Sequence, residues 1–308
     1  MATAIEALET DRRLLWGLCY RMTGNAADAD DLVQETFVRA IEKPPRRTDE
    51  PLRPWLVRVA INLSRDLLRR RKRHGYVGPW LPSPVPTDEE SPASYEPPAP
   101  SEDSPVARYD LKESISFAFL LALEALSPSQ RAVLLLRDVF DYSTSETAEA
   151  LDMTEANGKV VLLRARRRMK EYDKSRAAIS PALQEATRRA LEQFLLYLGA
   201  RDAAGLERLL AEEVVSLSDG GGEVNAARQP IRGRERVLRL ILGLAKKSLV
   251  EPRFAVLTLN GLPAIVVEDL PTTTGAATRY TIHFEVNGAG LVCGLHAVLA
   301  PSKLSAIR

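Results

Sequence analysis

The chain has 308 residues, of which 45% are apolar and 27% charged, the balance of a globular protein with two or three domains. It has no apolar run near the ~18 residues of a membrane span and no signal-peptide pattern at its start. Cys19 and Cys293 lie in helical and strand-like patterns, which favours two buried thiols over a disulfide or metal pair. We therefore expect a cytoplasmic protein with no membrane partner, no metal and no cofactor.

The first 75 residues are predicted to form three helices, because apolar residues recur at helical spacing up to the prolines at 44–45 and again after 54. The second helix is expected to bury Leu32, Val33, Phe37, Val38 and Ile41. The third, from about Pro54 to Arg73, is expected to bury Trp55, Leu56, Val59, Leu63 and Leu67.

The third helix also carries a basic stripe, which consists of Arg58, Asn62, Arg65, Arg69 and Arg73 at spacings of three and four residues. Guanidinium groups suit a phosphate backbone, and an amide suits a base edge. Residues 1–75 hold 15 Lys and Arg against 11 Asp and Glu, which weakly favours nucleic acid as a partner. The alternative is a solvated face whose Arg-rich end complements the helix dipole.

Residues 76–107 are predicted to be a linker. They hold 9 of the 20 prolines, six acidic residues and no Lys or Arg, a composition that does not build a packed core. Two large apolar side chains stand between prolines in the segment Gly78-Pro79-Trp80-Leu81-Pro82. This segment is either part of a stiff spacer or a docking peptide in polyproline conformation.

Residues 143–170 have the length and punctuation of a helix-turn-helix. A short helix, a turn at Asp152-Met153 and a longer helix started by Thr154 follow one another. One side of the longer helix is expected to be core, with Gly158, Val161, Leu162, Ala165 and Met169. The other side offers Lys159, Val160, Leu163, Arg164 and Arg167, with Asn157 in the first turn. Arginines on it would hold phosphates, and Val160 or Leu163 could touch a thymine methyl group.

From about residue 183 the pattern changes to helices followed by alternating strands, typical of an α+β domain. Helices are expected at about 183–199, 201–211 and 232–247, and strands at 253–259, 264–268, 279–286 and 291–299. Two histidines, His283 and His296, fall on these strands without an obvious carboxylate partner at short spacing. We interpret them as hydrogen-bonded strand residues.

Taken together, these features resemble a bacterial sigma factor of the extracytoplasmic-function (ECF) class, in the group with a fused C-terminal SnoaL-like (NTF2-like) domain. Three segments in order carry the resemblance to sigma regions 2 and 4: ADADDLVQETFVRAI, WLVRVAINLSRDLLRRRKR and LSPSQRAVLLLRDVFDYSTSETAEAL with EANGKVVLLRARRRM. The group's linker motif is matched by Trp80-Leu81-Pro82, its glycine motif by Asp219-Gly220-Gly221-Gly222, and its last motif partly by Ala300-Pro301-Ser302-Lys303-Leu304.

The resemblance implies a multidomain fold: two all-α sigma domains and a C-terminal α+β SnoaL-like cone. The expected boundaries are region 2 at 1–75, the linker at 76–107, region 4 at 108–172, the SnoaL-like domain at 183–300 and a tail at 301–308. It implies a sigma factor, not an enzyme, that binds core RNA polymerase and directs recognition of the promoter −35 and −10 elements in transcription initiation.

The resemblance also assigns residues to roles. Polymerase contacts fall on Asp30, Asp31, Gln34 and Glu35, a cluster of acidic and amide groups that a solvated face would also explain. Contacts to the −10 element fall on Arg58, Asn62, Arg65 and Arg69, with the loop around 44–50 as a further candidate. Contacts to the −35 element fall on Asn157, Lys159, Val160, Leu163, Arg164 and Arg167. Regulation between domains falls on Trp80, Leu81, Pro82, Asp219, Gly220, Gly221, Gly222, Lys303 and Leu304.

The sequence departs from the group at several positions. Glu223 stands where the group usually has Lys, and Ala300 and Ser302 replace polar residues. Asp152 replaces the usual Gly of the helix-turn-helix turn, where a left-handed conformation is expected. Val160 and Leu163 replace polar residues, so the −35 sequence does not carry over from the group.

No separate anti-sigma protein is evident from the sequence, so the SnoaL-like domain is expected to control the sigma domains in cis, with Trp80 as an anchor. A small-molecule ligand of the SnoaL-like cone stays open as a signal. Two other functions also stay open. One is a SnoaL-like enzyme, and the other is a DNA-binding regulator that never meets polymerase.

Overall fold

The computed structural model describes residues 2–44, 51–87, 108–176, 178–247, 253–268 and 275–307, with side chains from Leu8 onward. The loop expected to help with the −10 element lies largely outside these residues. The chain divides into two compact units. The first consists of Met1–Gly75 and Thr87–Arg176, and the second of Tyr76–Pro86 and Ala177–Arg308. The start of the predicted linker therefore belongs to the second unit.

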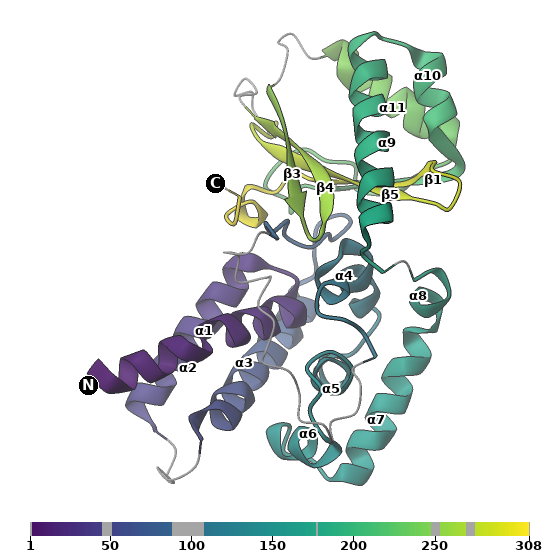
Figure 1. Cartoon of the computed structure of the whole chain (residues 1–308). Helices are drawn as coiled ribbons and strands as arrows, with labels where there is room; N and C mark the ends of the chain where they lie inside the picture. Colours follow the sequence, from purple (N-terminus) through teal and green to yellow (C-terminus); the bar gives the residue numbers. More distant parts are fainter. Residues whose placement is uncertain are drawn as a thin grey trace. The chain divides into compact units, whose positions relative to one another are not determined.

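The first unit is entirely helical in its described elements (Figure 1). Its N-terminal part is a bundle of α1 (Ala2–Thr23), α2 (Ala26–Glu42) and α3 (Leu52–His74). Then follow a 3-10 turn (Glu113–Ile115), α4 (Phe117–Leu123), α5 (Pro128–Asp138), α6 (Thr144–Ala150), α7 (Glu155–Arg168) and α8 (Lys170–Ser175).

The buried face of α3 differs from the predicted apolar stripe. Its buried residues are Leu56, Val57, Ala60, Ile61, Ser64 and Leu68. Only Leu56 of the predicted set is among them, and Trp55, Val59, Leu63 and Leu67 are partly exposed. The expected phase was wrong because small and polar residues, Ala60 and Ser64, occupy the tightest contacts. Ser64 is tolerated there because its hydroxyl donates to the Ala60 carbonyl at 2.7 Å.

Helices α5, α6 and α7 begin where side chains cap them. Ser127 and Ser143 each form a reciprocal capping box with the residue three positions on, Gln130 and Glu146. Asp152, in the turn after α6, has φ 52°, the left-handed conformation expected at this position. These local signals define a helix-turn-helix of α6 and α7.

The second unit packs helices on one face of a six-stranded sheet (Figure 1). Its helices are α9 (Pro181–Gly199), α10 (Ala203–Leu209) and α11 (Arg234–Lys247). Its strands are β1 (Leu210–Asp219), β2 (Ile231–Arg232), β3 (Arg253–Leu259), β4 (Leu262–Glu268), β5 (Tyr280–Val286) and β6 (Val292–Val298), in the order β2-β1-β6-β5-β4-β3. The meander β3 to β6 is antiparallel as predicted, and β1 joins it by parallel pairing with β6.

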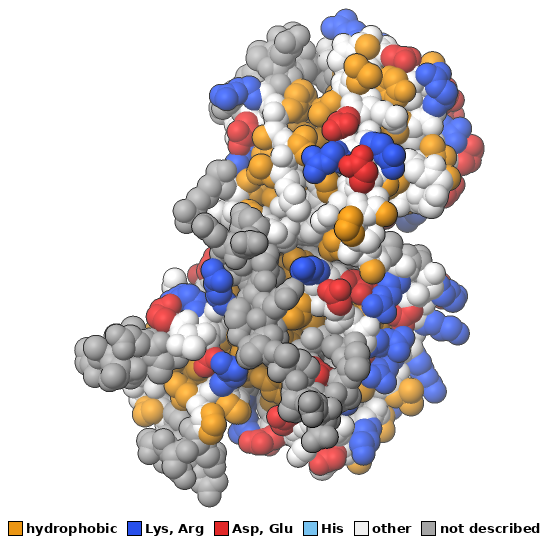
Figure 2. All heavy atoms as spheres, in the orientation of Figure 1, with side chains coloured by type: hydrophobic (Ala, Val, Ile, Leu, Met, Phe, Trp, Pro, Cys, Tyr) orange, Lys and Arg blue, Asp and Glu red, His pale blue; other side chains and the backbone are white. Residues whose placement is uncertain are grey.

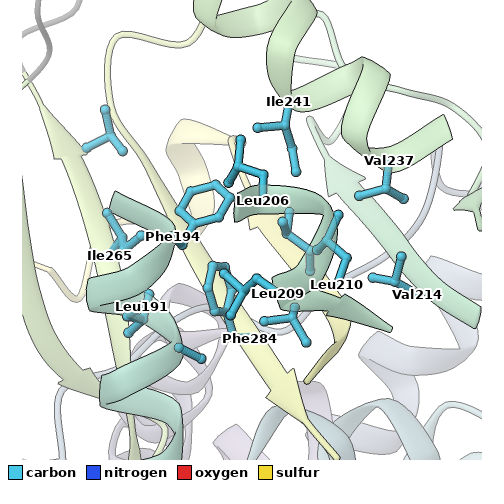
Figure 3. Close-up of a cluster of buried hydrophobic side chains, with 14 residues drawn as sticks. Leu191, Phe194, Leu206, Leu209, Leu210, Val214, Val237, Ile241, Ile265 and Phe284 are labelled. Carbon is cyan, nitrogen blue, oxygen red and sulfur yellow. The ribbon is translucent and has the colours of Figure 1, made fainter. Parts of the chain in front are cut away.

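The core of this unit lies between the sheet and the helices (Figure 3). Phe194 of α9 meets Phe284 of β5 edge to face, with ring centroids 5.2 Å apart. Side chains alternate along a strand, so Thr281, His283 and Glu285 face the side of the sheet away from this core. The predicted α+β architecture is confirmed.

Candidate functional site: the nucleic-acid faces and the linker dock

The four residues predicted to bind polymerase are all exposed on α2: Asp30, Asp31, Gln34 and Glu35. Asp30 accepts a hydrogen bond from the Trp16 indole at 2.8 Å, and Glu35 pairs with Arg39 at 2.8 Å. Partial burial raises the pKa of the Asp30 carboxyl, and the bond from Trp16 opposes that shift. The cluster is thus anchored at one end and open to a partner along the rest.

Two apolar residues continue this exposed face, contrary to the expectation that they are core. Val38 is 45% exposed and Ile41 63% exposed. They follow Gln34 and Glu35 at helical spacing, so the face passes from acidic to apolar along α2. The apolar pattern suggested a core stripe, but only Leu32, Val33 and Phe37 of that stripe reach the interior.

The basic stripe of α3 is in contact with the second half of its own unit. Arg58 donates to the Glu149 carbonyl of α6 at 2.7 Å and lies 3.5 Å from its carboxylate. Arg65 donates to the Ser129 hydroxyl of α5 at 3.1 Å and to the Asn62 side chain at 3.3 Å. Burial lowers the pKa of Arg65. Three of the four predicted −10 residues are therefore engaged with, or beside, the helices of region 4.

The fourth residue of the stripe contacts its own helix. Arg69 is exposed and pairs with Asp66 on its own helix at 2.9 Å. Contacts with α5 and α6 are thus made at Arg58 and Arg65.

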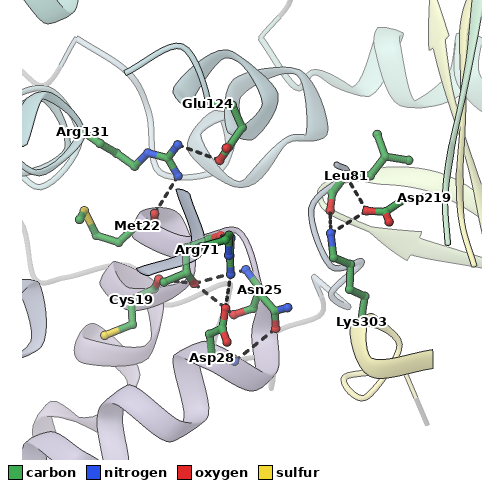
Figure 4. A network of polar contacts seen from close by, with 11 residues as sticks. Cys19, Met22, Asn25, Asp28, Arg71, Leu81, Glu124, Arg131, Asp219 and Lys303 are labelled. Carbon is green, nitrogen blue, oxygen red and sulfur yellow. Dashed lines mark hydrogen bonds and ion pairs between the residues drawn. The ribbon is translucent and has the colours of Figure 1, made fainter. Parts of the chain in front are cut away.

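Two buried arginines join the halves of the first unit. Arg21, 1% exposed, donates to the Ser114 hydroxyl at 2.6 Å and the Leu111 carbonyl at 2.9 Å. Arg131, 3% exposed, donates to the Met22 and Leu123 carbonyls, each at 2.8 Å (Figure 4). Burial lowers the pKa of Arg21 to about 10, so it stays protonated at neutral pH. These buried cations, bonded to carbonyl oxygens and in Arg131 also to the Glu124 carboxylate, tie α1 to α5 and to the turn before α4.

The predicted −35 residues are all exposed on α7, and they are Asn157, Lys159, Val160, Leu163, Arg164 and Arg167. The opposite side is packed inward as expected, with Gly158 and Ala165 buried. Figure 2 shows Lys and Arg side chains gathered over this side of the first unit. A helix with cations and two apolar side chains on its open face has the chemistry of a major-groove reader.

In the second unit, the linker motif docks on a buried carboxylate. Asp219, at the end of β1, is 0% exposed. It accepts hydrogen bonds from the Tyr76 hydroxyl at 2.6 Å, the Leu81 amide at 2.7 Å and the Gly221 amide at 3.0 Å. Its remaining partner is the Lys303 ammonium at 2.6 Å (Figure 4). Four donors on two oxygens compensate for burying the charge.

Lys303 is held equally well on its other sides. It is 3% exposed, donates to the Leu81 carbonyl and lies over the rings of Tyr76 and Trp80, at 4.7 and 4.5 Å from their centroids. A desolvated ammonium between two aromatic faces gains cation–π attraction. We call residues Tyr76–Pro86, Asp219–Gly222 and Lys303–Leu304 the linker dock.

Two glycines of the dock adopt conformations that L side chains rarely take. Gly221 and Gly222 have φ of 60° and 80°. A Cβ on Gly221 would lie 3.1 Å from the Ala300 Cβ, and one on Gly222 would lie 3.3 Å from the Val77 side chain. Gly220 is limited by space instead, because its Cβ would lie 2.5 Å from the Val224 carbonyl oxygen. The glycines let the linker approach the sheet end.

The departures from the group's motifs form a pair of their own. Glu223 accepts hydrogen bonds from the amide and the hydroxyl of Ser302. The two loops are thus linked through residues at which the sequence departs from the motifs.

Sequence reasoning missed Tyr76 and the second half of the docked segment. Val85 exchanges hydrogen bonds with Asn260, from its amide to the side chain at 3.0 Å and from the Asn260 amide to its carbonyl at 2.9 Å. Leu81, Pro82 and Leu304 are buried and Trp80 partly so. The one signal for this in the sequence was the pair of large apolar side chains among prolines, which favoured a docking peptide.

The two histidines lie opposite each other on β5 and β6. His283 is within 3.1 Å of the Thr281 hydroxyl, and burial lowers its pKa to about 3. His296 lies 3.5 Å from a carboxylate oxygen of Glu285, which is on the neighbouring strand β5 and distant in sequence. Strand pairing brings together residues that sequence spacing separates.

The residues that the structure describes include no group of three or more His, Cys, Asp or Glu side chains that could hold a metal ion. No helix among them is long and apolar enough to cross a membrane.

Comparison with known proteins places these sites in a family. Residues 8–74 match the model of sigma-70 region 2, and residues 116–169 match that of sigma-70 region 4. The chain is 32% identical to the ECF RNA polymerase sigma factor SigJ of Mycobacterium tuberculosis, over 98% of this chain and 93% of SigJ. It is 36% identical to the sigma factor SigG of the same species, over 66% of this chain and 56% of SigG.

The crystal structure of M. tuberculosis SigJ matches 98% of each chain with a TM-score of 0.71 and 27% identity. The similarity therefore extends through the linker and the C-terminal α+β domain as well as the sigma regions. The chain belongs to the ECF RNA polymerase sigma factors.

Proposed function

We propose that the chain binds core RNA polymerase through the exposed face of α2 and directs it to promoters, rather than catalysing a reaction. The observation that carries this is the open acidic-to-apolar face of Asp31, Gln34, Glu35, Val38 and Ile41 in a chain whose family is that of sigma factors. Exposed apolar side chains beside acidic ones are costly on a solvated helix and useful at an interface. Such a protein acts in the cytoplasm, with polymerase and DNA.

Co-elution with sigma-free core polymerase tests this role. The full chain and a truncation ending at residue 178 are compared with the double variant Asp31→Ala, Gln34→Ala and with Ile41→Ala. Glu185→Ala, an exposed acidic residue on α9, serves as a matched control. We expect the α2 variants to bind at least tenfold more weakly than the control. Binding by neither length of chain would contradict the proposal.

We further propose that α3 reads the −10 element and α7 the −35 element. Arg58, Arg65 and Arg69 supply phosphate contacts and Asn62 a base-edge contact, as the stripe's chemistry suggests. Opening the duplex requires bases to leave the stack at a cost of a few kcal/mol each, so the stripe must reach DNA unobstructed. The contacts of Arg58 and Arg65 with α5 and α6 support a resting state in which it does not.

Control in cis by the SnoaL-like domain is the finer part of the proposal. Docking of residues 76–86 leaves region 2 joined to the second unit directly after Gly75. Region 4 joins the same unit through the few residues between α8 and α9. Both sigma domains are then tethered to one body with little slack, and no separate anti-sigma protein is needed for inhibition.

The length of the linker gives an estimate of how much docking shortens the free chain between regions 2 and 4. Fully extended, residues 76–107 span roughly 110 Å, whereas residues 87–107 alone span roughly 70 Å. Undocking therefore frees eleven more residues, which adds roughly 40 Å to the free tether between regions 2 and 4.

Disrupting the dock tests the control. We expect Trp80→Ala to increase cleavage of the linker by a protease and to change transcription from a cognate promoter several-fold. Lys246→Ala, at an exposed residue of α11, is the matched control. Unchanged transcription and unchanged cleavage in Trp80→Ala would remove the anchor from the proposal.

A further inference from the structure

Two apolar side chains on the open face of α7 are about half exposed. Val160 is 46% exposed and Leu163 53% exposed, while Gly158 and Ala165 on the other side are buried. They are one turn apart on the same side of the helix, which places their side chains next to each other along its axis. Exposed apolar residues are common singly, but two adjacent ones in the middle of a basic face call for an explanation.

The charges around the pair indicate what covers it. Lys159, Arg164 and Arg167 are exposed on the same face, and the exposed carboxylate of α7 is Glu155 in its first turn. A face that combines cations with apolar groups complements a polyanion that carries apolar groups. In the major groove of DNA that group is the C5-methyl of thymine. A protein partner would match this face less well, because it would have to present several carboxylates at the spacing of the cations.

We propose that Val160 and Leu163 read thymine methyl groups in adjacent base pairs of the −35 element, so that specificity there comes from apolar contact rather than from hydrogen bonds. This rests on the proposed function of α7 as the −35 reader. The rise of 1.5 Å per residue separates the two side chains by about 4.5 Å along the helix, close to the 3.4 Å step between base pairs.

The apolar pair also selects against the other bases. A side chain without donors or acceptors leaves the polar edge of a G·C pair desolvated and unpaired, which costs affinity. Asn157, one turn before Val160 and exposed, carries the amide that suits an adenine edge. The face as a whole therefore favours a −35 element with neighbouring A·T pairs.

The methyl group itself is the probe. The preferred −35 element is first selected from a randomised promoter with holoenzyme made from the full chain. Each thymine in it is then replaced by uracil, which removes the methyl and leaves every hydrogen-bonding group in place. We expect a loss of about fourfold in promoter binding for each contacted methyl, from the value of one buried methylene.

Protein variants are then tested on the thymine and uracil promoters. Val160→Ala and Leu163→Ala should each bind the thymine promoter more weakly and lose sensitivity to uracil at one position. Arg164→Ala should weaken both promoters equally, since phosphate contacts ignore the methyl. Leu196→Ala, an exposed apolar residue of α9, should behave as wild type.

Three results would overturn the inference. If holoenzyme transcribes but the selected element has no adjacent A·T pairs, or uracil has no effect, the methyl reading fails and the sigma function stands. If Val160→Ala keeps full sensitivity to uracil, another residue reads the methyl. If no polymerase-dependent transcript forms from any promoter, the proposed function fails and the inference falls with it.

Discussion

The linker dock and the contact between Arg58 of α3 and Glu149 of α6 both join segments far apart in the chain. They differ in how deeply their charged groups are buried. The dock buries an ion pair between Asp219 and Lys303, with side-chain exposures of 0% and 3%. The α3 contact relies on Arg58 and Glu149, with side chains 40% and 74% exposed. Breaking one partner of a buried pair typically costs 3–5 kcal/mol, whereas an exposed pair contributes about 0.2–1 kcal/mol. The Arg58–Glu149 pair therefore holds the basic stripe weakly, whereas the Asp219–Lys303 pair holds the linker strongly.

This difference suggests an order of events. Breaking the exposed Arg58–Glu149 pair costs little, but separating the whole α1–α3 bundle from region 4 would also remove the buried Arg21 and Arg131 from their partners. Releasing the linker requires either a large compensating interaction or a change at the dock itself. A signal that acts on the dock is therefore expected to change the arrangement of the linker the most.

Removing the lysine of the dock should have the largest effect. Lys303→Ala leaves the Asp219 carboxylate buried without its cation, and we expect the second unit to lose about 3–5 kcal/mol of unfolding free energy. Denaturant unfolding followed by Trp fluorescence would measure it. A smaller loss in the double variant Lys303→Met, Asp219→Asn would show that the unpaired charge, and not lost packing, is responsible. A Lys303→Ala protein as stable as wild type would contradict the strength assigned to the dock.

Acid should weaken the second unit through His283. Burial lowers its pKa in the folded state to about 3, so the folded state disfavours the charged form. A depressed histidine pKa means stability is full above the unfolded value of about 6.5 and is lost as the pH falls below it. Between pH 7.5 and pH 5 the loss is about 2 kcal/mol from this group.

The measurement is the unfolding free energy of wild type and His283→Gln at both pH values. The variant should lose about 2 kcal/mol less on acidification, although it is less stable overall. Equal pH dependence of the two proteins would show that His283 does not carry the effect.

The Glu223–Ser302 hydrogen bonds should contribute little to the unfolding free energy. Paired substitutions should show whether the two residues interact directly. Both residues are exposed, so Glu223→Ala should cost below about 1 kcal/mol. Glu223→Lys together with Ser302→Asp should be at least as stable as wild type, because an ion pair replaces the hydrogen bond. Thermal unfolding of the single and double variants would test this, and a double variant worse than both singles would rule out direct coupling.

The smallest effect is expected at the α3 contact. Glu149→Ala removes the carboxylate beside Arg58 but leaves the backbone carbonyl that accepts its hydrogen bond. We expect a change in stability within about 0.5 kcal/mol and a modest gain in promoter binding, measured by fluorescence anisotropy with holoenzyme. A loss of several kcal/mol would place this contact in the same class as the dock and remove the contrast.

Much of the fold was predictable because its local signals are strong. The capping serines of α5 and α6, the left-handed Asp152 and the alternation of β5 each specify structure within a few residues. The phase of α3 was not predictable from apolar spacing, because its closest contacts use Ala60 and Ser64. The residues of the dock were named from motifs, yet their geometry depends on Tyr76 and Asn260, which no local pattern distinguishes. The His296–Glu285 proximity is a product of strand register.

The docked segment also changes what a break in the chain would mean. Region 2 continues into residues 76–86, and these are hydrogen-bonded to β1, to Asn260 and to Lys303 of the second unit. A cut anywhere in residues 87–107 would sever the covalent path from region 2 to region 4 but not the noncovalent one. The two fragments should stay together as a single particle, and a pair expressed separately as 1–87 and 108–308 should assemble through the Asp219 and Lys303 contacts, the Val85–Asn260 bonds and the buried contacts of Arg21 and Arg131.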